Sequence, residues 1–200
     1  MAGYHHGNLR DAILAASASA IARDGIGRLS LRAMATDLGV SHTAFRRHFG
    51  SREGVLNALA TQGNRWLADQ LRAAENGSFG DVGVAYVRFA LTHPGHFTVM
   101  FRPDLLDNDD PELAAARADA LAPLREGVQA LGAADSTAAE VARWGMVHGI
   151  AMLALTGSLT NALAGPLGAP AAARTPAEIE ELARAALTLL CPDTPPLDEK

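Results

Sequence analysis

The chain has 200 residues, of which 48% are hydrophobic and 20% are charged. This composition can bury a core and excludes an intrinsically disordered chain, and the single cysteine, Cys191, excludes an intramolecular disulfide framework. The net charge of −5 is unevenly divided, because the first 65 residues carry +4 and the remainder carries −9. A basic segment joined to an acidic body favours a polyanion-binding head, although a chance fluctuation of charge would give the same numbers.

Neither a secretory signal nor a membrane span is predicted. The amino end lacks a charged segment followed by an apolar run. The longest apolar stretch, from Gly145 to Leu155, is interrupted by His148 and is shorter than the roughly 20 residues that cross a bilayer. We therefore expect a cytoplasmic protein without membrane contact.

Helical spacing of apolar residues runs through the chain, and no alternating β-branched run predicts a strand, so the sequence predicts an all-α fold. A first helix is expected at 8–23. Ser30 and Ser41 are predicted to cap two short helices, which reach Leu38 and His48 and are separated by a tight turn at Gly39. Ser51 then caps a longer helix at 52–75. Further helices are predicted at 80–93, 94–101, 111–131 with Pro123 able to kink it, 136–163 and 176–190.

The segment from Leu31 to Phe49 has the spacing of a helix-turn-helix. Ala35 stands where the two helices approach most closely, Gly39 fits the turn, and apolar positions such as Phe45 face the shared core. Polar side chains are left on the outer side of the third helix, where they can reach base edges or phosphates in a major groove. These are His42, Thr43, Arg46 and Arg47, with Arg32 and Arg52 at the starts of neighbouring helices as candidate phosphate contacts. A helical hairpin with solvated arginines is the alternative.

Four stretches, Tyr4–Arg10, Leu29–Ala35, Leu38–Phe45 and Arg47–Leu56, resemble the amino-terminal domain of the TetR family of one-component transcriptional regulators. The resemblance implies a three-helix DNA-binding head, a connecting fourth helix, a variable all-helical effector domain and a homodimer. It places the DNA contacts on Arg32, His42, Thr43, Arg46, Arg47, His48 and Arg52. Arg46 stands where the family usually has a tyrosine, so this position can either hold a phosphate or read guanine.

The resemblance also implies the domain organisation. We expect a helix-turn-helix domain at 1–50, a connecting helix with an effector-binding and dimerisation domain at 51–191, and a disordered tail at 192–200. In the family the last two helices pair with their symmetry mates, which here are the predicted helices at 136–163 and 176–190.

The carboxy-terminal body resembles a TetR subgroup that bears a Trp-x-x-x-His-Gly motif, here Trp144–Gly149. Helical spacing places Trp144, His148 and Met152 on one apolar stripe, in which His148 is the only ionisable member. Such a stripe can line a mostly apolar ligand pocket, and ordinary core packing explains it equally well. The candidate lining residues are Tyr86, Phe89, Phe97, Met100, Phe101, Trp144, His148 and Met152.

The sequence therefore predicts a ligand-relieved repressor that binds a palindromic DNA operator as a dimer and responds to a small apolar or amphipathic effector. No catalysis, cofactor or metal is expected, since His93 and His96 flank Pro94-Gly95 without a thiolate or paired carboxylate. Two alternatives stay open: a ligand-independent architectural DNA-binding protein, and a small helical enzyme with a histidine base.

Overall fold

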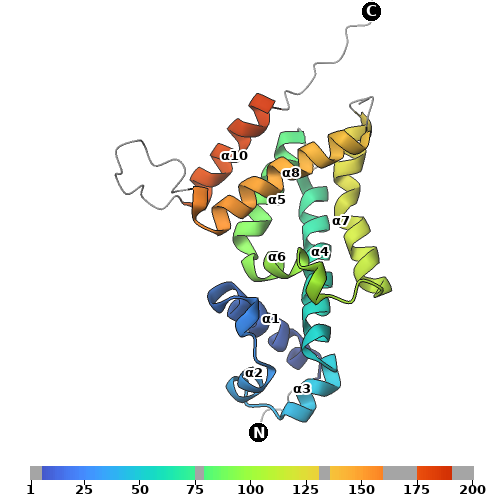
Figure 1. The fold of residues 1–200 in the computed structure, drawn as a ribbon, viewed down its shortest axis with the longest axis vertical. Helices are drawn as coiled ribbons and strands as arrows, with labels where there is room; N and C mark the ends of the chain where they lie inside the picture. The colour runs from blue at the N-terminus through green and yellow to red at the C-terminus, as the bar shows by residue number, and fades with distance from the viewer. Residues whose placement is uncertain (1–5, 75–78, 131–135, 160–174, 191–200) are drawn as a thin grey trace, which may run out of the picture. The chain divides into compact units, whose positions relative to one another are not determined.

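The computed structural model describes residues 6–74, 79–130, 136–159 and 175–190 (Figure 1). Within these ranges the regular structure is helical and there is no strand, which confirms the predicted all-α class. The elements are α1 (His6–Asp24), η1, a 3₁₀ turn (Ile26–Arg28), α2 (Leu31–Asp37), α3 (His42–Phe49), α4 (Arg52–Ala74), α5 (Phe79–Thr92), α6 (Pro94–Met100), η2, a second 3₁₀ turn (Pro103–Leu105), α7 (Pro111–Ala130), α8 (Ser136–Leu155) and α10 (Pro176–Leu190).

The predicted serine caps of α2 and α4 form in the structure. The Ser30 hydroxyl accepts a hydrogen bond from the Ala33 N–H at 3.4 Å, and the Ser51 hydroxyl accepts one from the Gly54 N–H at 3.1 Å. Gly39 has a φ of 64° in the turn between α2 and α3, in the left-handed region that favours glycine. These short-range bonds set the helix-turn-helix geometry.

The prediction of one helix over 136–163 was wrong. Helix α8 ends at Leu155, and the chain turns at Gly157, whose φ is 71°. The Gly157 N–H donates to the Ala154 carbonyl at 3.1 Å, so the left-handed glycine satisfies a carbonyl of the last helical turn. The rest of that prediction, at 160–163, lies outside the described residues, as do Cys191 and the predicted tail at 192–200.

The chain divides into two compact units. Unit 1 comprises Met1–Trp66 and His93–Ala118, and unit 2 comprises Leu67–Thr92 and Asp119–Lys200. Unit 1 therefore joins α1, α2 and α3 to the first part of α4, to α6 and to the start of α7. Whether residues 1–50 form a domain by themselves stays a prediction, because a compact unit does not test independent folding.

In unit 1, α6 is packed directly against α1. At Gly95 a Cβ atom would lie 2.1 Å from the Ala18 carbonyl oxygen, far inside van der Waals contact. Ile13 and Leu14 of α1 are almost fully buried in the core. A residue without a side chain at position 95 thus sets the spacing of the two helices.

In unit 2, α5, α8 and α10 lie side by side (Figure 1). Val87 of α5 and Ala183 of α10 are fully buried in a shared apolar cluster. At the edge of this cluster, Arg88 of α5 pairs with Glu180 of α10 at 2.6 Å. The cluster therefore fixes α10 to α5.

No helix within the described ranges combines the length and the hydropathy needed to cross a membrane.

Candidate functional site

The outer face of α3 presents polar side chains opposite a buried aromatic residue. Phe45 is 0% exposed, whereas Thr43, Arg46 and Arg47 are exposed. Successive residues of an α-helix are turned by about 100°, so Arg47 lies about 40° to one side of Thr43 and Arg46 about 60° to the other. The two guanidinium groups therefore flank Thr43 on a single surface, as a helix in a major groove requires.

The other predicted DNA contacts occupy different places. Arg32 is exposed in the first turn of α2, and His42 is the first residue of α3, with its side chain outside the described residues. His48 is half-buried and lies about 140° around α3 from Thr43, so it does not share the face that carries Thr43 and Arg47.

Arg52 has a partner within the protein. Its Nη2 group donates to the carbonyl oxygen of Ile26 at 2.5 Å, and the side chain is half-buried. The start of α4 is thereby tied to the turn η1. The sequence offers no signal for this bond, because it joins residues 26 positions apart and its acceptor is a backbone carbonyl.

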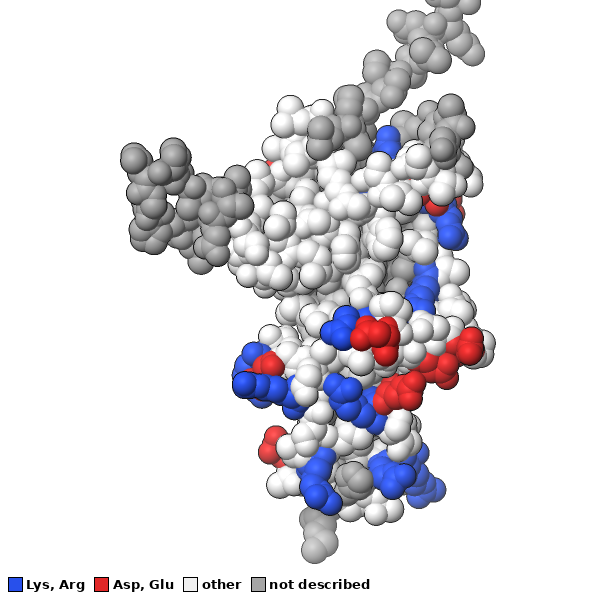
Figure 2. All heavy atoms as spheres, viewed as in Figure 1, with Lys and Arg blue, Asp and Glu red and all other residues white. Residues whose placement is uncertain are grey.

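Charge is separated on the surface of unit 1. Arginine side chains gather over α1, α2 and α3, and acidic side chains gather around the segment between η2 and α7 (Figure 2). Five acidic residues follow one another at short intervals from η2 into the first turn of α7: Asp104, Asp107, Asp109, Asp110 and Glu112. The basic surface coincides with the outer face of α3, so a polyanion is attracted to the helix-turn-helix.

In unit 2, three of the predicted pocket residues meet across α5 and α8. The Trp144 Nε1–H donates to the Tyr86 hydroxyl oxygen at 3.3 Å, and the same hydroxyl is hydrogen-bonded to His148 Nδ1 at 2.9 Å. Burial raises the pKa of Tyr86 and lowers the pKa of His148, so both side chains are neutral near pH 7. The three side chains thus form one hydrogen-bonded group across α5 and α8.

Two family models match the chain. Residues 13–59 match the bacterial regulatory proteins of the tetR family, and residues 79–190 match the tetracyclin repressor-like C-terminal domain. The second match covers more than half of the chain. The chain belongs to the TetR family.

Individual proteins support the same assignment. The chain is 28% identical over 159 residues to an uncharacterised HTH-type transcriptional regulator, Rv0681, of Mycobacterium tuberculosis, covering 76% of this chain and 72% of that protein. A protein of unknown function from Rhodococcus sp. RHA1 has a TM-score of 0.71 and 30% identity, covering 93% of this chain and 95% of the other.

The TetR family regulator PfmR from Thermus thermophilus has the same fold, with a TM-score of 0.66 and 22% identity over 93% of this chain and 97% of that one. The predicted function class is thereby confirmed: this TetR-family protein is a DNA-binding transcriptional regulator.

The remaining pocket candidates of this TetR-family regulator are distributed over both units. Phe89, in unit 2, and Phe97, in unit 1, are 0% exposed. Phe101 lies with its ring centroid 4.9 Å from that of Phe97, and Met100 is buried in the same unit. Met152 is 41% exposed on the protomer surface. The structure thus joins Tyr86, Trp144 and His148 directly, and the full lining stays a prediction.

The two histidines around Pro94-Gly95 surround a tryptophan that the sequence did not single out. The Trp66 ring centroid lies 5.2 Å from that of His93 and 4.8 Å from that of His96. Burial lowers the pKa of His96 to about 4, and its neutral Nε2–H donates to Gln62 Oε1 at 3.0 Å. Among the described residues, no three His, Cys, Asp or Glu side chains form a group that could hold a metal.

Proposed function

We propose that this TetR-family protein is a homodimeric repressor that binds a palindromic operator and releases it when a small apolar or amphipathic ligand binds. The outer face of α3, with Thr43 between Arg46 and Arg47 and Phe45 buried behind them, is the observation that carries the proposal. In this proposal residues 1–50 read DNA and residues 51–191 hold the ligand and the dimer interface. The protein acts in the cytoplasm, without catalysis, cofactor or metal.

The DNA contacts divide by their place on the head. His42 and Thr43, at the start of α3, are the proposed base readers, because the amino-terminal residues of a recognition helix contact base edges. Arg46 and Arg47, one on each side of Thr43, are assigned to the phosphates that border the groove. Arg32 and Arg52 complete the proposed set, with Arg52 keeping its bond to Ile26. His48 is left out of it, because its side chain is half-buried and lies away from the face of Thr43.

Tight and specific operator binding requires a dimer. A single small DNA-binding module buries only about 600–1,000 Å² of protein surface against DNA, which is at or below the lower end of specific protein–DNA interfaces. The last described helices offer a surface for pairing. Val141, Met152 and Leu153 of α8 and Leu189 of α10 are large apolar residues that are exposed in the protomer. Gly145 and Gly149 have no described atom outside their own helix within 4 Å of where a Cβ would lie, which leaves room for close approach of a second helix.

The dimer proposal predicts that Val141→Asp combined with Leu189→Asp yields a monomer. Two carboxylates would have to be buried in the paired helices without partners, and this costs several kcal/mol per protomer. Sedimentation equilibrium at micromolar concentration should show a dimer for the unmodified protein and a monomer for the variant, with operator affinity reduced at least about 100-fold. Ala115→Asp, which adds a charge to the exposed face of α7, should remain dimeric. A monomeric unmodified protein would contradict the proposal.

The ligand proposal predicts that His148→Ala raises the ligand concentration needed for release from the operator without weakening DNA binding in the absence of ligand. The polar network of Tyr86, Trp144 and His148 supplies few anchors in apolar surroundings, so loss of one should weaken ligand binding about tenfold or more. The measurement is operator binding with and without a compound selected from an apolar library for releasing the unmodified protein.

Tyr86→Phe, which removes only the hydroxyl, should lower the response to the same compound by a smaller factor. Loss of operator affinity in ligand-free His148→Ala would show that His148 is structural. An unchanged response of both variants would place the ligand elsewhere.

A further inference from the structure

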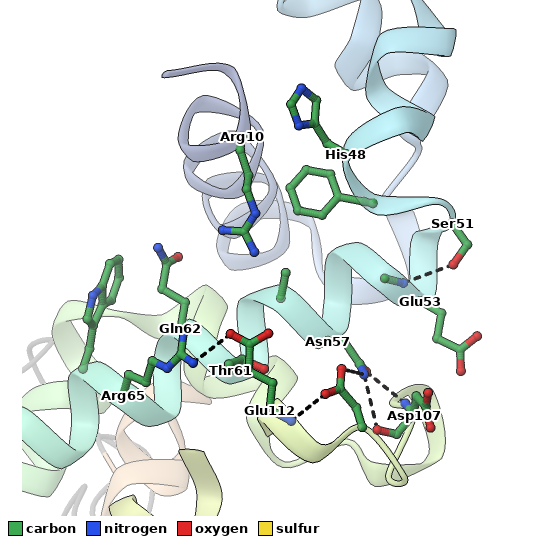
Figure 3. A pocket seen from close by; sticks show the side chains of 15 residues that line it. Arg10, His48, Ser51, Glu53, Asn57, Thr61, Gln62, Arg65, Asp107 and Glu112 are labelled. Atoms are coloured by element: carbon green, nitrogen blue, oxygen red, sulfur yellow. Dashed lines mark hydrogen bonds and ion pairs between the residues drawn. The ribbon is translucent and has the colours of Figure 1, made fainter. Parts of the chain in front are cut away.

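Asn57 joins α4 to the segment that leads into α7 (Figure 3). Its Nδ2 group donates to the Asp107 carbonyl oxygen at 3.3 Å and to the Asp110 carboxylate at 3.2 Å. Its Oδ1 atom accepts from the Asp107 N–H at 2.9 Å. The side chain is only 7% exposed, and its partners lie 50 and 53 positions further along the chain. One buried amide therefore fixes this segment to α4.

Asp110 is bonded to both helices at once. Its Oδ1 atom accepts from the N–H groups of Glu112 and Leu113, at 2.8 and 3.3 Å, and so caps the start of α7. Its Oδ2 atom accepts from Asn57. The Asn57 bond is the main cause of the lowered pKa of Asp110, and the carboxylate is ionised at neutral pH. The first turn of α7 and its attachment to α4 thus depend on the same side chain.

Arg52 and Asn57 hold the first two turns of α4 on different sides. Arg52 is bonded to the Ile26 carbonyl of η1, and Asn57 is bonded to the segment before α7. Five helical positions separate the two residues, which corresponds to about 7.5 Å along the helix axis and about 140° around it. An α-helix is stiff over this length, so a displacement at Asn57 also moves the backbone that carries Arg52.

The segment before α7 has room to move away from α4 when these bonds are broken. Asn57, Asp107 and Asp110 line a cleft of about 590 Å³. A neighbouring ion pair, Arg65 with Glu112, is more than half exposed on both sides and contributes little. Without the Asn57 bonds, polar groups at a buried position lose their partners, and α4 or the segment must shift so that water can reach them.

We propose that Asn57 is a positioning residue for operator binding, because its bond to Asp110 keeps the start of α4 where Arg52 can reach a DNA phosphate. This role rests on the proposed phosphate contact of Arg52. It adds a residue that acts on DNA binding without contact to DNA, from within unit 1.

Exchanging the two side chains tests this role without changing the net charge. Asp110→Asn alone keeps an oxygen to cap α7 but turns an amide NH₂ group toward that of Asn57, so the bond between them is lost. Asn57→Asp combined with Asp110→Asn reverses donor and acceptor and restores the bond. Asp109→Asn removes the same charge from an exposed neighbour and is the matched control.

The first measurement is fluorescence anisotropy with a duplex selected from random sequence for binding to the unmodified protein. Asp110→Asn should bind this duplex about tenfold or more weakly, although removal of a carboxylate by itself favours DNA binding. The exchanged pair should bind within about threefold of the unmodified protein. Asp109→Asn should bind equally well or slightly more tightly.

All variants are compared at a temperature at which circular dichroism shows them folded, so a lower stability alone leaves the affinity unchanged. If Asp110→Asn does not fold, Asn57→Ala takes its place with the same expectation. Asn57→Ala removes the amide and leaves the cap of α7 intact.

Amide hydrogen exchange without DNA tests the link from Asn57 to η1 separately. The Leu29 N–H closes the η1 turn by donating to the Ile26 carbonyl, which also accepts from Arg52. This amide should exchange about threefold or more faster in Asp110→Asn, because Arg52 holds the turn less firmly. The original rate should return in the exchanged pair.

Unchanged operator affinity in Asp110→Asn, unchanged exchange of the Leu29 amide, or no recovery in the exchanged pair would each overturn the proposal. Arg52→Gln distinguishes this failure from a failure of the proposed function. Weaker binding by Arg52→Gln beside unchanged binding by Asp110→Asn would overturn the role of Asn57 alone. Unchanged binding by Arg52→Gln would contradict the phosphate contact itself, and with it the role of Asn57.

Discussion

Replacing Arg46 by tyrosine in both protomers is expected to flatten the salt dependence of operator binding. Each phosphate contact by a cation contributes a slope of about −0.9 to log affinity against log salt, so losing one contact per protomer changes the slope by about 1.8. The affinity at low salt should fall about 100-fold, since a charge-assisted contact contributes roughly a factor of ten and the dimer loses two. Fluorescence anisotropy with a labelled operator between about 50 and 200 mM salt measures both quantities.

Two matched variants identify the role of Arg46. Arg125→Gln removes an exposed charge from α7 in unit 2 and should leave the slope unchanged. Thr43→Ala should keep the slope and relax the preference at one base pair, at a cost of roughly 1–3 kcal/mol per contact. If Arg46→Tyr changed base preference and kept the slope, Arg46 would read guanine and our assignment to a phosphate would be wrong.

Replacing Gly95 by alanine is expected to destabilise unit 1 by about 3 kcal/mol or more. The new Cβ would lie 2.1 Å from the Ala18 carbonyl oxygen and 2.9 Å from its Cα, and backbone atoms cannot move aside as the end of a flexible side chain can. For a chain of this size such a loss lowers Tm by roughly 6–12 °C. Thermal unfolding followed by far-ultraviolet circular dichroism measures the change.

Gly27→Ala is the control for this substitution. Gly27 has no described atom near the place of a Cβ, and its φ lies outside the left-handed region. Its replacement should leave Tm within about 2 °C, as surface substitutions usually do. Equal Tm values for Gly95→Ala and the unmodified protein would contradict this prediction. They would show that α1 and α6 can move apart without loss of folding stability.

The sequence predicted correctly those local features that depend on residues close together in the chain. Ser30, Ser51 and Gly39 act within a few positions of themselves, so the caps and the turn of the helix-turn-helix could be predicted. The helix at 136–163 was predicted too long because the apolar pattern continues through Gly157, where a left-handed backbone ends α8. The pattern of apolar residues does not show which glycine adopts that conformation.

The candidate site was predictable only in part, for a related reason. The outer face of α3 follows from helical periodicity, whereas Tyr86 and His148 were predicted only as lining residues of one pocket and not as hydrogen-bond partners. The close approach of Gly95 to Ala18 and the stacking of Trp66 on His96 join residues far apart in sequence. Such contacts depend on how helices cross, and no local pattern in the chain encodes them.

The bond from Arg52 to the Ile26 carbonyl gives one side chain two roles in the proposed complex. A guanidinium has five N–H donors, so it can hold the carbonyl and a DNA phosphate together. The carbonyl and the phosphate accept from different N–H groups, so the bond to Ile26 holds the guanidinium in place for the phosphate. Phosphate binding and ordering of the η1 turn are thermodynamically linked. If an ordered η1 turn raises the affinity of Arg52 for the phosphate, bound phosphate stabilises the ordered turn by the same factor. Amide hydrogen exchange in the η1 turn should therefore slow when the operator is bound.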